Sequence, residues 1–183
     1  KKQKNVIQKI IGKDTKCNIP NTKYLLYGPS ASGKTEVYIH SILEIRKKNP
    51  EKQFLILLPE LTLTPQALER YSAYFDESEI ALLSSNLSKV RYYSNWQKIR
   101  SGEVRLIIGT RMAVFAPFQD LGLIIIDEEQ DISFKQCDMN PRYDARKAGE
   151  KLSEIHDCPL ILGSATPRVE DYYHATRKKI QFL

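Results

Sequence analysis

Residues 28 to 35 read Gly-Pro-Ser-Ala-Ser-Gly-Lys-Thr, the pattern of a phosphate-binding loop: glycine, four residues, then Gly-Lys-Thr. Gly28 and Gly33 let the backbone turn so that its N–H groups face the phosphates. Lys34 would reach the β and γ phosphates, and the hydroxyl of Thr35 would bind Mg²⁺. The pattern therefore predicts a nucleoside triphosphate site with Mg²⁺, formed by Gly28, Ser30, Ser32, Gly33, Lys34 and Thr35.

A second chemical signal is the apolar run at 123–126, which ends in Asp127, Glu128, Glu129 and Gln130. Ligands of a parallel sheet bind at the carboxyl ends of its strands. Asp127 would hold the metal through a water, and Glu128 would accept a proton from the water that attacks the γ phosphate. The alternative is a solvent-exposed acidic turn after a buried strand, and the phosphate loop upstream favours the chemical interpretation.

Apolar runs alternate with segments of helical spacing, which is typical of a mostly parallel sheet with helices on both faces. Several runs are nearly continuous in Ile, Leu and Val, as in strands buried on both faces. The expected strands are Tyr24–Tyr27, Phe54–Leu58, Ile80–Ser84, Arg105–Gly109, Leu123–Asp127 and Leu160–Gly163. The expected helices are Glu36–Lys48, Pro65–Phe75, Ser88–Arg100, Tyr143–His156 and Val169–Lys178. Pro65 suits a first helical position, and Ser88 suits a helix cap.

Composition is that of an ordinary globular domain, with 183 residues, 42% of them hydrophobic and 27% charged. No apolar run approaches the roughly 18 residues that a membrane span needs, so we expect a cytoplasmic protein. The net charge of +6 suits an anionic partner such as nucleic acid, and a solvated lysine-rich surface explains it about as well. Cys17, Cys137 and Cys158 show no Cys-x-x-Cys pairing, which indicates reduced thiols without a disulfide or a zinc site.

Further motifs occur in a defined order along the chain. They include Pro-Glu-Leu-Thr-Leu-Thr-Pro-Gln at 59–66, Gly-Thr-Arg-Met-Ala-Val-Phe-Ala-Pro at 109–117 and Gly-Ser-Ala-Thr-Pro at 163–167, with other blocks at 25–38, 96–102, 121–130, 134–136 and 142–146. Together they resemble the PriA-type replication-restart helicases, which are superfamily 2 DNA motors. The resemblance implies a RecA-like ATP-binding domain of a 3′–5′ DNA helicase that reloads the replication machinery at stalled forks.

The resemblance implies roles for the nucleotide site that agree with those argued from the residues. The implied positions are Gly33, Lys34, Thr35, Asp127 and Glu128, with ATP and Mg²⁺ as cofactors. Gln3 resembles the adenine-contacting glutamine of the family, and an ordinary exposed glutamine is the alternative. The family usually has histidine where this chain has Gln130, and an amide cannot change charge near neutral pH. We therefore expect Gln130 to affect the coupling between ATP and DNA more than nucleotide binding.

DNA contact, or the coupling of DNA contact to ATP, is implied for three groups of residues. Thr64, Thr110 and Arg111 lie in motifs that track a DNA strand and would donate to phosphates; turn and cap roles are the alternative. Ser164 and Thr166 would hydrogen-bond the residues at 127–130, although they also suit a turn. An aromatic-rich loop would supply a stacking face from Phe134 and charge from Lys135, Arg142 and Arg146, unless Phe134 packs in the core and the arginines are plain surface.

The resemblance further implies regions that these residues lack: an N-terminal DNA-binding region, a second RecA-like domain with an arginine finger, and a zinc insertion. We therefore expect residues 1–183 to be a single RecA-like domain of a longer chain, with little turnover alone. Implied partners are forked and single-stranded DNA, primosome proteins and single-strand-binding proteins, and a monomer is expected.

Two other functions fit parts of the pattern. A GTPase or small-molecule kinase would share the phosphate loop, but the chain has no Asn-Lys-x-Asp run to read guanine. A nucleotide-gated DNA-binding or scaffold module with weakened coupling is the stronger alternative, because Gln130 replaces the family histidine.

Overall fold

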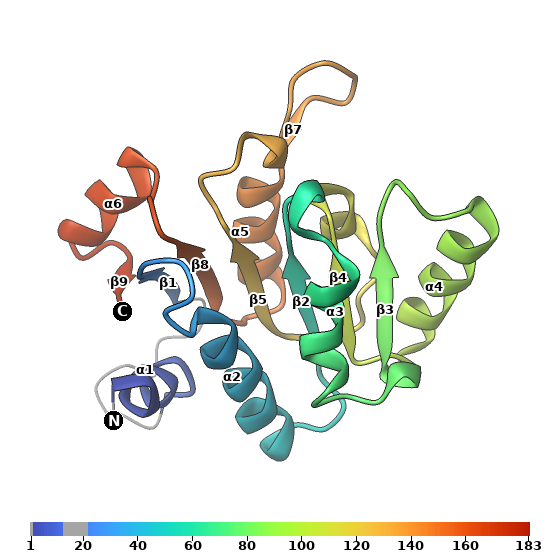
Figure 1. Cartoon of the computed structure of the whole chain (residues 1–183), viewed down its shortest axis with the longest axis horizontal. Coiled ribbons are helices and arrows are strands. Elements are labelled where there is room, and N and C mark those ends of the chain that lie inside the picture. Colours follow the sequence, from blue (N-terminus) through green and yellow to red (C-terminus); the bar gives the residue numbers. More distant parts are fainter. Residues whose placement is uncertain (1, 13–21) are drawn as a thin grey trace.

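The structure is a computed structural model that describes residues 2–12 and 22–183. A seven-stranded sheet forms its centre, in the order β3-β4-β2-β5-β8-β1-β9, and all neighbouring strands pair in parallel (Figure 1). The strands are β1 (Lys23–Tyr27), β2 (Gln53–Leu57), β3 (Ile80–Leu83), β4 (Leu106–Gly109), β5 (Leu121–Asp127), β8 (Leu160–Ser164) and β9 (Gln181–Phe182). The predicted mostly parallel sheet is confirmed.

Six of these strands coincide with the predicted apolar runs, with ends that differ by no more than two residues. Every residue of β2, β4 and β8 is buried, which explains why their sequences are apolar without alternation. The sequence does not predict β9 or the antiparallel hairpin of β6 (Lys135–Gln136) and β7 (Tyr143–Asp144). Two residues are too few to show a strand period.

Helices cover both faces of the sheet, as predicted. They are α1 (Lys2–Ile10), α2 (Lys34–Lys48), α3 (Pro65–Ser72), α4 (Lys89–Ser101), α5 (Ala145–Ile155) and α6 (Val169–Thr176). Apolar side chains of α1, α2 and α3 pack in one cluster, and those of α4, α5 and α6 pack in another. Figure 1 shows α2 and α3 in front of the sheet and α5 behind it. The sequence pattern misses α1, a short amphipathic segment in a polar region.

Helix caps explain where three helices begin. The hydroxyl of Ser88 accepts from the backbone N–H of Arg91 at 3.3 Å, which confirms the predicted cap. Thr64 caps α3 in the same way, with Pro65 in the first turn. The start predicted at Tyr143 is wrong, because Tyr143 and Asp144 belong to β7 and Asp144 caps α5. Short 3-10 turns complete the connections: η1 (Glu60–Thr62), η2 (Glu77–Glu79), η3 (Arg111–Phe115) and η4 (Ile132–Phe134).

Parallel strands bring distant segments to one edge of the sheet. The segments that follow β1, β2, β4, β5 and β8 all leave at the same edge, since these strands run in one direction. No helix in the described ranges is long and apolar enough to cross a membrane. Of the cysteines, Cys158 is buried, Cys137 is exposed, both are free thiols, and Cys17 lies outside the described residues.

Candidate functional site

The phosphate loop lies between β1 and α2 in a tightly turned conformation. Gly33 has a φ of 86° and Ala31 a φ of 60°, so both occupy the left-handed region. Glycine adopts this conformation freely, whereas alanine does so at a cost in backbone energy that is typical of functional sites. The ammonium group of Lys34 donates to the carbonyls of Gly28 at 3.0 Å and Pro29 at 3.3 Å, so it lies over the loop. A bound phosphate would draw the lysine from these carbonyls.

Gln3 reaches the phosphate loop from α1. A Cβ atom at Gly33 would collide with Nε2 of Gln3, so the amide of Gln3 lies against the glycine. Gln3 also lines a cleft of about 330 Å³ between α1 and α2, together with Glu36 and His40. The predicted nucleotide-contacting glutamine is therefore placed beside the loop by a helix that the sequence pattern misses.

Asp127 is fixed at the end of β5 by two hydrogen bonds to one oxygen. Its Oδ1 accepts from the hydroxyl of Tyr38 at 2.8 Å and from the backbone N–H of Glu128 at 3.1 Å. Burial raises the pKa of Asp127 above its usual value, and the hydrogen bond from Tyr38 opposes this rise. Gly163 on β8 leaves room for this contact, because a Cβ there would collide with the Tyr38 hydroxyl. No motif in the sequence marks Tyr38 for this role.

Glu128 follows with a φ of 49°, an unusual conformation for a residue with a side chain. Its Oε2 accepts from Nε2 of Gln130 at 2.8 Å, and Oε1 of Gln130 accepts from the hydroxyl of Ser164 at 2.5 Å. Gln130 therefore bridges the carboxylate to β8. The backbone N–H of Thr166 donates to the Ser164 hydroxyl at 3.0 Å, while the exposed side chain of Thr166 has no hydrogen bond to the acids in the described ranges.

These elements enclose a cleft of about 450 Å³. Its lining consists of Ser30, Ala31, Gly33, Lys34, Thr35, Glu36, Arg70, Asp127 and Glu128. Arg70 comes from α3 and has no sequence signal, since a single arginine in a helix resembles any surface residue.

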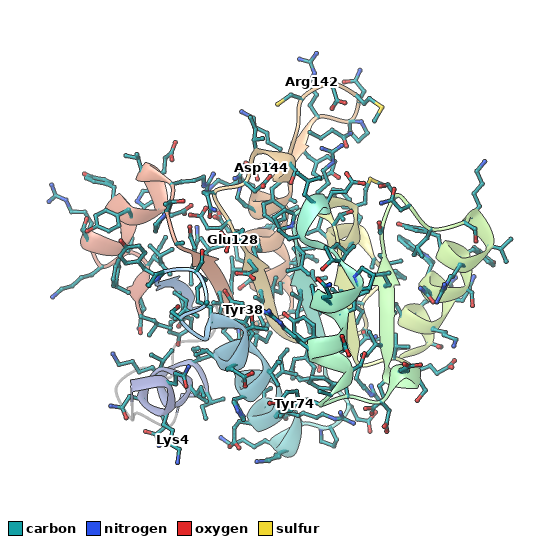
Figure 2. All side chains as sticks on the ribbon, viewed as in Figure 1. Lys4, Tyr38, Tyr74, Glu128, Arg142 and Asp144 are labelled. Atoms are coloured by element: carbon teal, nitrogen blue, oxygen red, sulfur yellow. The ribbon has the colours of Figure 1, made fainter. Side chains whose placement is uncertain are left out.

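Thr35 and Asp127 supply oxygen atoms to the same space, and the described residues hold no cluster of three potential metal ligands. This donor set fits Mg²⁺, which is held mainly by phosphates and waters with one or two protein oxygens. Figure 2 shows Tyr38 and Glu128 near the centre of the molecule.

The third acid, Glu129, has a structural role. Its side chain is fully buried, and its carboxylate accepts from the backbone N–H and from Nε of Arg168, both at 2.9 Å. Burial raises the pKa of Glu129, and the backbone hydrogen bond and positive charge of Arg168 oppose the rise. Arg168 also pairs with buried Asp171. This network ties the segment after β5 to the start of α6, a contact that the sequence does not predict.

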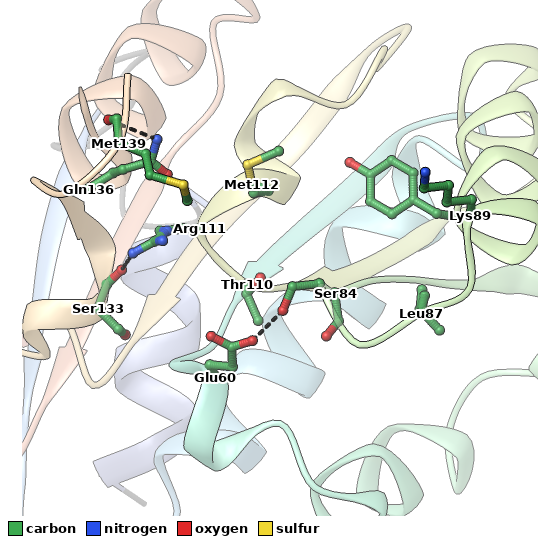
Figure 3. A pocket seen from close by; sticks show the side chains of 12 residues that line it. Glu60, Ser84, Leu87, Lys89, Thr110, Arg111, Met112, Ser133, Gln136 and Met139 are labelled. Carbon is green, nitrogen blue, oxygen red and sulfur yellow. Dashed lines mark hydrogen bonds between the residues drawn. The ribbon is translucent and has the colours of Figure 1, made fainter. Parts of the chain in front are cut away.

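A second hollow, of about 390 Å³, lies at the same edge of the sheet and is here called the strand groove. Its lining includes Glu60, Ser84, Ser85, Leu87, Lys89, Tyr92, Thr110, Arg111, Met112, Ser133, Gln136 and Met139. Arg111 donates to the carbonyl of Ser133 at 3.2 Å, and Figure 3 shows it between Ser133 and Thr110. The predicted pair Thr110 and Arg111 thus meets in one groove. Thr64 does not line it, and its hydroxyl caps α3.

Two predicted DNA contacts are wrong. Phe134 is fully buried in the core cluster that also contains Ala113 of η3 and Ala145 of α5, so it offers no stacking face. Arg146 is 4% exposed, because its guanidinium donates to the carboxylate of Asp144 at 2.8 Å and to the carbonyl of Glu129 at 2.8 Å. Lys135 and Arg142 are exposed, and Figure 2 shows Arg142 on the hairpin that projects from the sheet edge.

The family model described as DEAD/DEAH box helicase matches residues 1–174. The chain is 46% identical over 160 residues to the replication restart protein PriA of Bacillus subtilis, covering 87% of this chain and 19% of that protein. It is 43% identical over 153 residues to PriA of Synechocystis, covering 84% of this chain and 18% of the relative. The chain thus spans about a fifth of the length of these relatives.

Solved structures share the fold. RecG bound to a three-way DNA junction matches with a TM-score of 0.68 at 23% identity, over 98% of this chain and 22% of RecG. The helicase domain of Pyrococcus furiosus Hef matches with a TM-score of 0.61 at 18% identity, over 99% of this chain and 39% of Hef.

Proposed function

This chain belongs to the DEAD/DEAH box helicase family, and from that premise we propose that it is the ATP-binding half of a DNA-dependent motor that restarts replication at stalled forks. The observation that carries the proposal is the cleft in which the phosphate loop faces Asp127 and Glu128. Similarity to two PriA proteins supports the role in replication restart.

In the proposed mechanism, the loop N–H groups and Lys34 bind the phosphates, and Gln3 contacts the nucleotide beside Gly33. Thr35 and Asp127 would hold Mg²⁺, Asp127 through a water, and the metal would neutralise charge on the phosphates. Tyr38 fixes the orientation of the Asp127 carboxylate. Glu128 accepts the proton of the attacking water, and Gln130 holds Glu128 in place.

The strand groove is proposed to bind the sugar-phosphate backbone of DNA. Arg111 and Lys89 supply donors there, and phosphate contacts position a strand without reading its sequence. Thr110 lines the groove but is only 5% exposed, so it is not assigned a phosphate contact. Lys135 and Arg142 add exposed positive charge on the hairpin side. The link from Ser164 through Gln130 to Glu128 is proposed to carry changes at β8 to the proton acceptor.

Further properties of the full-length protein are proposed from the same likeness. They are 3′–5′ translocation, a second RecA-like domain that supplies an arginine finger, zinc bound outside this chain, a monomeric state and a cytoplasmic location. Primosome and single-strand-binding proteins are its proposed partners. Without the finger, we expect this chain to bind Mg-ATP and hydrolyse it slowly, because such a finger contributes about 10³ to 10⁵ in rate in comparable enzymes.

The test is Glu128→Gln in the full-length protein. The variant should bind Mg-ATP normally and lose about 10² to 10⁴ in DNA-stimulated hydrolysis, because the amide cannot accept the proton. Calorimetry measures the binding, and phosphate release measures the rate. Glu154→Gln, an exposed site on α5, is the matched control. Hydrolysis at the parental rate in Glu128→Gln would refute the assignment of the proton acceptor.

A further inference from the structure

A group of partly exposed rings lies beside the strand groove and has no role in the mechanism above. Tyr92, Tyr93 and Trp96 from α4 face Met112 and Phe115 from η3 across a hollow of about 380 Å³, here called the aromatic hollow. Tyr93 is 64% exposed, Phe115 50% and Met112 45%. Tyr92 and Met112 line both the aromatic hollow and the strand groove, so the two are continuous.

The rings are held in place by ordered packing. On α4, Ile99 is fully buried and the side-chain amide of Asn95 donates to the carbonyl of Leu82 on β3 at 2.7 Å, which fixes the face that α4 turns outward. Tyr92 and Trp96 stack with ring centroids 6.1 Å apart and planes 25° apart. Phe115 packs edge-on against Tyr143 at 4.8 Å. The hollow is therefore preformed, and a preformed exposed apolar surface indicates a binding site.

The charge around the hollow favours a polyanion with flat apolar groups. The helix that supplies three of the rings has no acidic residue, and its Lys89 lines the adjoining strand groove, while its Lys98 pairs with Glu103. Arg111 precedes Met112 directly and lines the strand groove. Interleaved rings and cations are typical of surfaces that stack nucleobases while their cations meet the phosphates.

We propose that the aromatic hollow stacks unpaired bases of a DNA strand whose phosphates lie in the strand groove. This inference rests on the proposed function and specifies how the strand is held. It assigns stacking to Phe115 and Tyr93, which are at least half exposed, and to Trp96, which lines the hollow while packing partly against the core, whereas Phe134 is buried. Arg111 positions the sugar-phosphate backbone of the DNA in the strand groove, and the rings hold its bases in the aromatic hollow.

The test measures binding of fluorescent single-stranded DNA by anisotropy, with Trp96→Ala and Phe115→Ala variants of the 183-residue chain. Each variant should bind an ordinary strand about tenfold more weakly, since removing one stacking ring costs about that factor. Against a strand with abasic nucleotides the variants and the wild type should bind alike, because no base is left to stack. Trp96→Phe should restore most of the affinity.

Two controls separate stacking from charge and from unfolding. The salt dependence should stay unchanged in the ring variants, because they remove no phosphate contact. Tyr173→Ala removes an exposed tyrosine from α6, which lies at the opposite end of the molecule from α4 (Figure 1), and should bind as the wild type does.

Equal losses on ordinary and abasic strands, or no loss on either, would overturn the proposal; the second result would point to a protein-docking face instead. Mg-ATP binding in the same samples keeps the two proposals apart. Normal ATP binding with unchanged strand binding counts against the aromatic hollow alone, whereas absent ATP binding in the wild type counts against the proposed function.

Discussion

The nucleotide cleft and the strand groove lie at the same edge of one sheet but are held in different ways. In the cleft, the positions of the reacting groups follow from short segments, such as the turn at Gly33 and the bond between Asp127 and the next backbone N–H. In the groove, Arg111 donates to the carbonyl of Ser133 and Ser85 donates to Glu60, and the two members of each pair are far apart in the chain.

This difference shows when a sequence motif is sufficient to predict the role of its residues. A phosphate loop works through its own backbone, so its residues keep their roles wherever the loop forms. A DNA-contacting side chain must be exposed, and exposure depends on what packs around it. Phe134 and Arg146 lie in segments that resemble DNA-contacting motifs, yet tertiary packing turns both inward.

The largest expected effect tests the buried state of Phe134. Phe134→Ala should lower the free energy of unfolding by about 3 to 5 kcal/mol, because it leaves a cavity in the core. Phe115→Ala, which truncates a half-exposed ring of the same type, should cost under about 1 kcal/mol. Urea unfolding of both variants gives the comparison. Equal losses would show that the two rings are not distinguished by burial.

The next prediction tests the buried state of Arg146 through its partner, Asp144. Burial raises the pKa of Asp144, but hydrogen bonds from Arg146 outweigh burial and hold it below the usual value. Asp144→Asn should therefore cost about 2 to 3 kcal/mol at pH 7, because it leaves a buried guanidinium poorly paired.

The sign of the pH dependence follows from the lowered pKa. A depressed folded-state pKa contributes stability above the unfolded pKa of about 3.9, and this contribution is lost as pH falls through the folded value. The difference between wild type and Asp144→Asn should then shrink below about pH 4. Urea midpoints at pH 7 and pH 3 measure it, and a constant difference would exclude an electrostatic origin.

The fold and the nucleotide cleft are largely predictable from the sequence. Continuous apolar runs predict six strands because both faces of the sheet are covered. The residues of the phosphate loop are neighbours in the sequence, and so are the acids after β5, so each motif can be recognised within its own short segment. Tyr38, Arg70 and the pair of Glu129 with Arg168 are not predictable, since each depends on contacts between distant elements.

A smaller effect tests the cleft itself. Lys34→Ala should weaken Mg-ATP binding by about 10- to 100-fold, the loss expected for one hydrogen bond to a charged phosphate. Lys48→Ala, an exposed site at the far end of α2, should bind normally. Calorimetry on the 183-residue chain measures both. Parental affinity in Lys34→Ala would mean that the loop does not hold the phosphates.

The smallest effect concerns a contact in the cleft that depends on distant elements. Tyr38 on α2 reaches Asp127 only because Gly163 on β8 has no side chain. Tyr38→Phe keeps the ring and removes the hydrogen bond, so the Asp127 carboxylate loses its fixed orientation at a cost of about 1 kcal/mol. The Mg²⁺ concentration needed for half-maximal nucleotide binding should rise about fivefold, while binding measured without Mg²⁺ should stay the same.

Tyr71→Phe is the control, because Tyr71 is a buried tyrosine for which the described residues show no hydrogen bond to Asp127. If both variants raised the Mg²⁺ requirement equally, general loosening of the core would explain the effect. If neither did, the carboxylate would be oriented by its backbone bond alone, and this part of the cleft would also depend only on its own short segment.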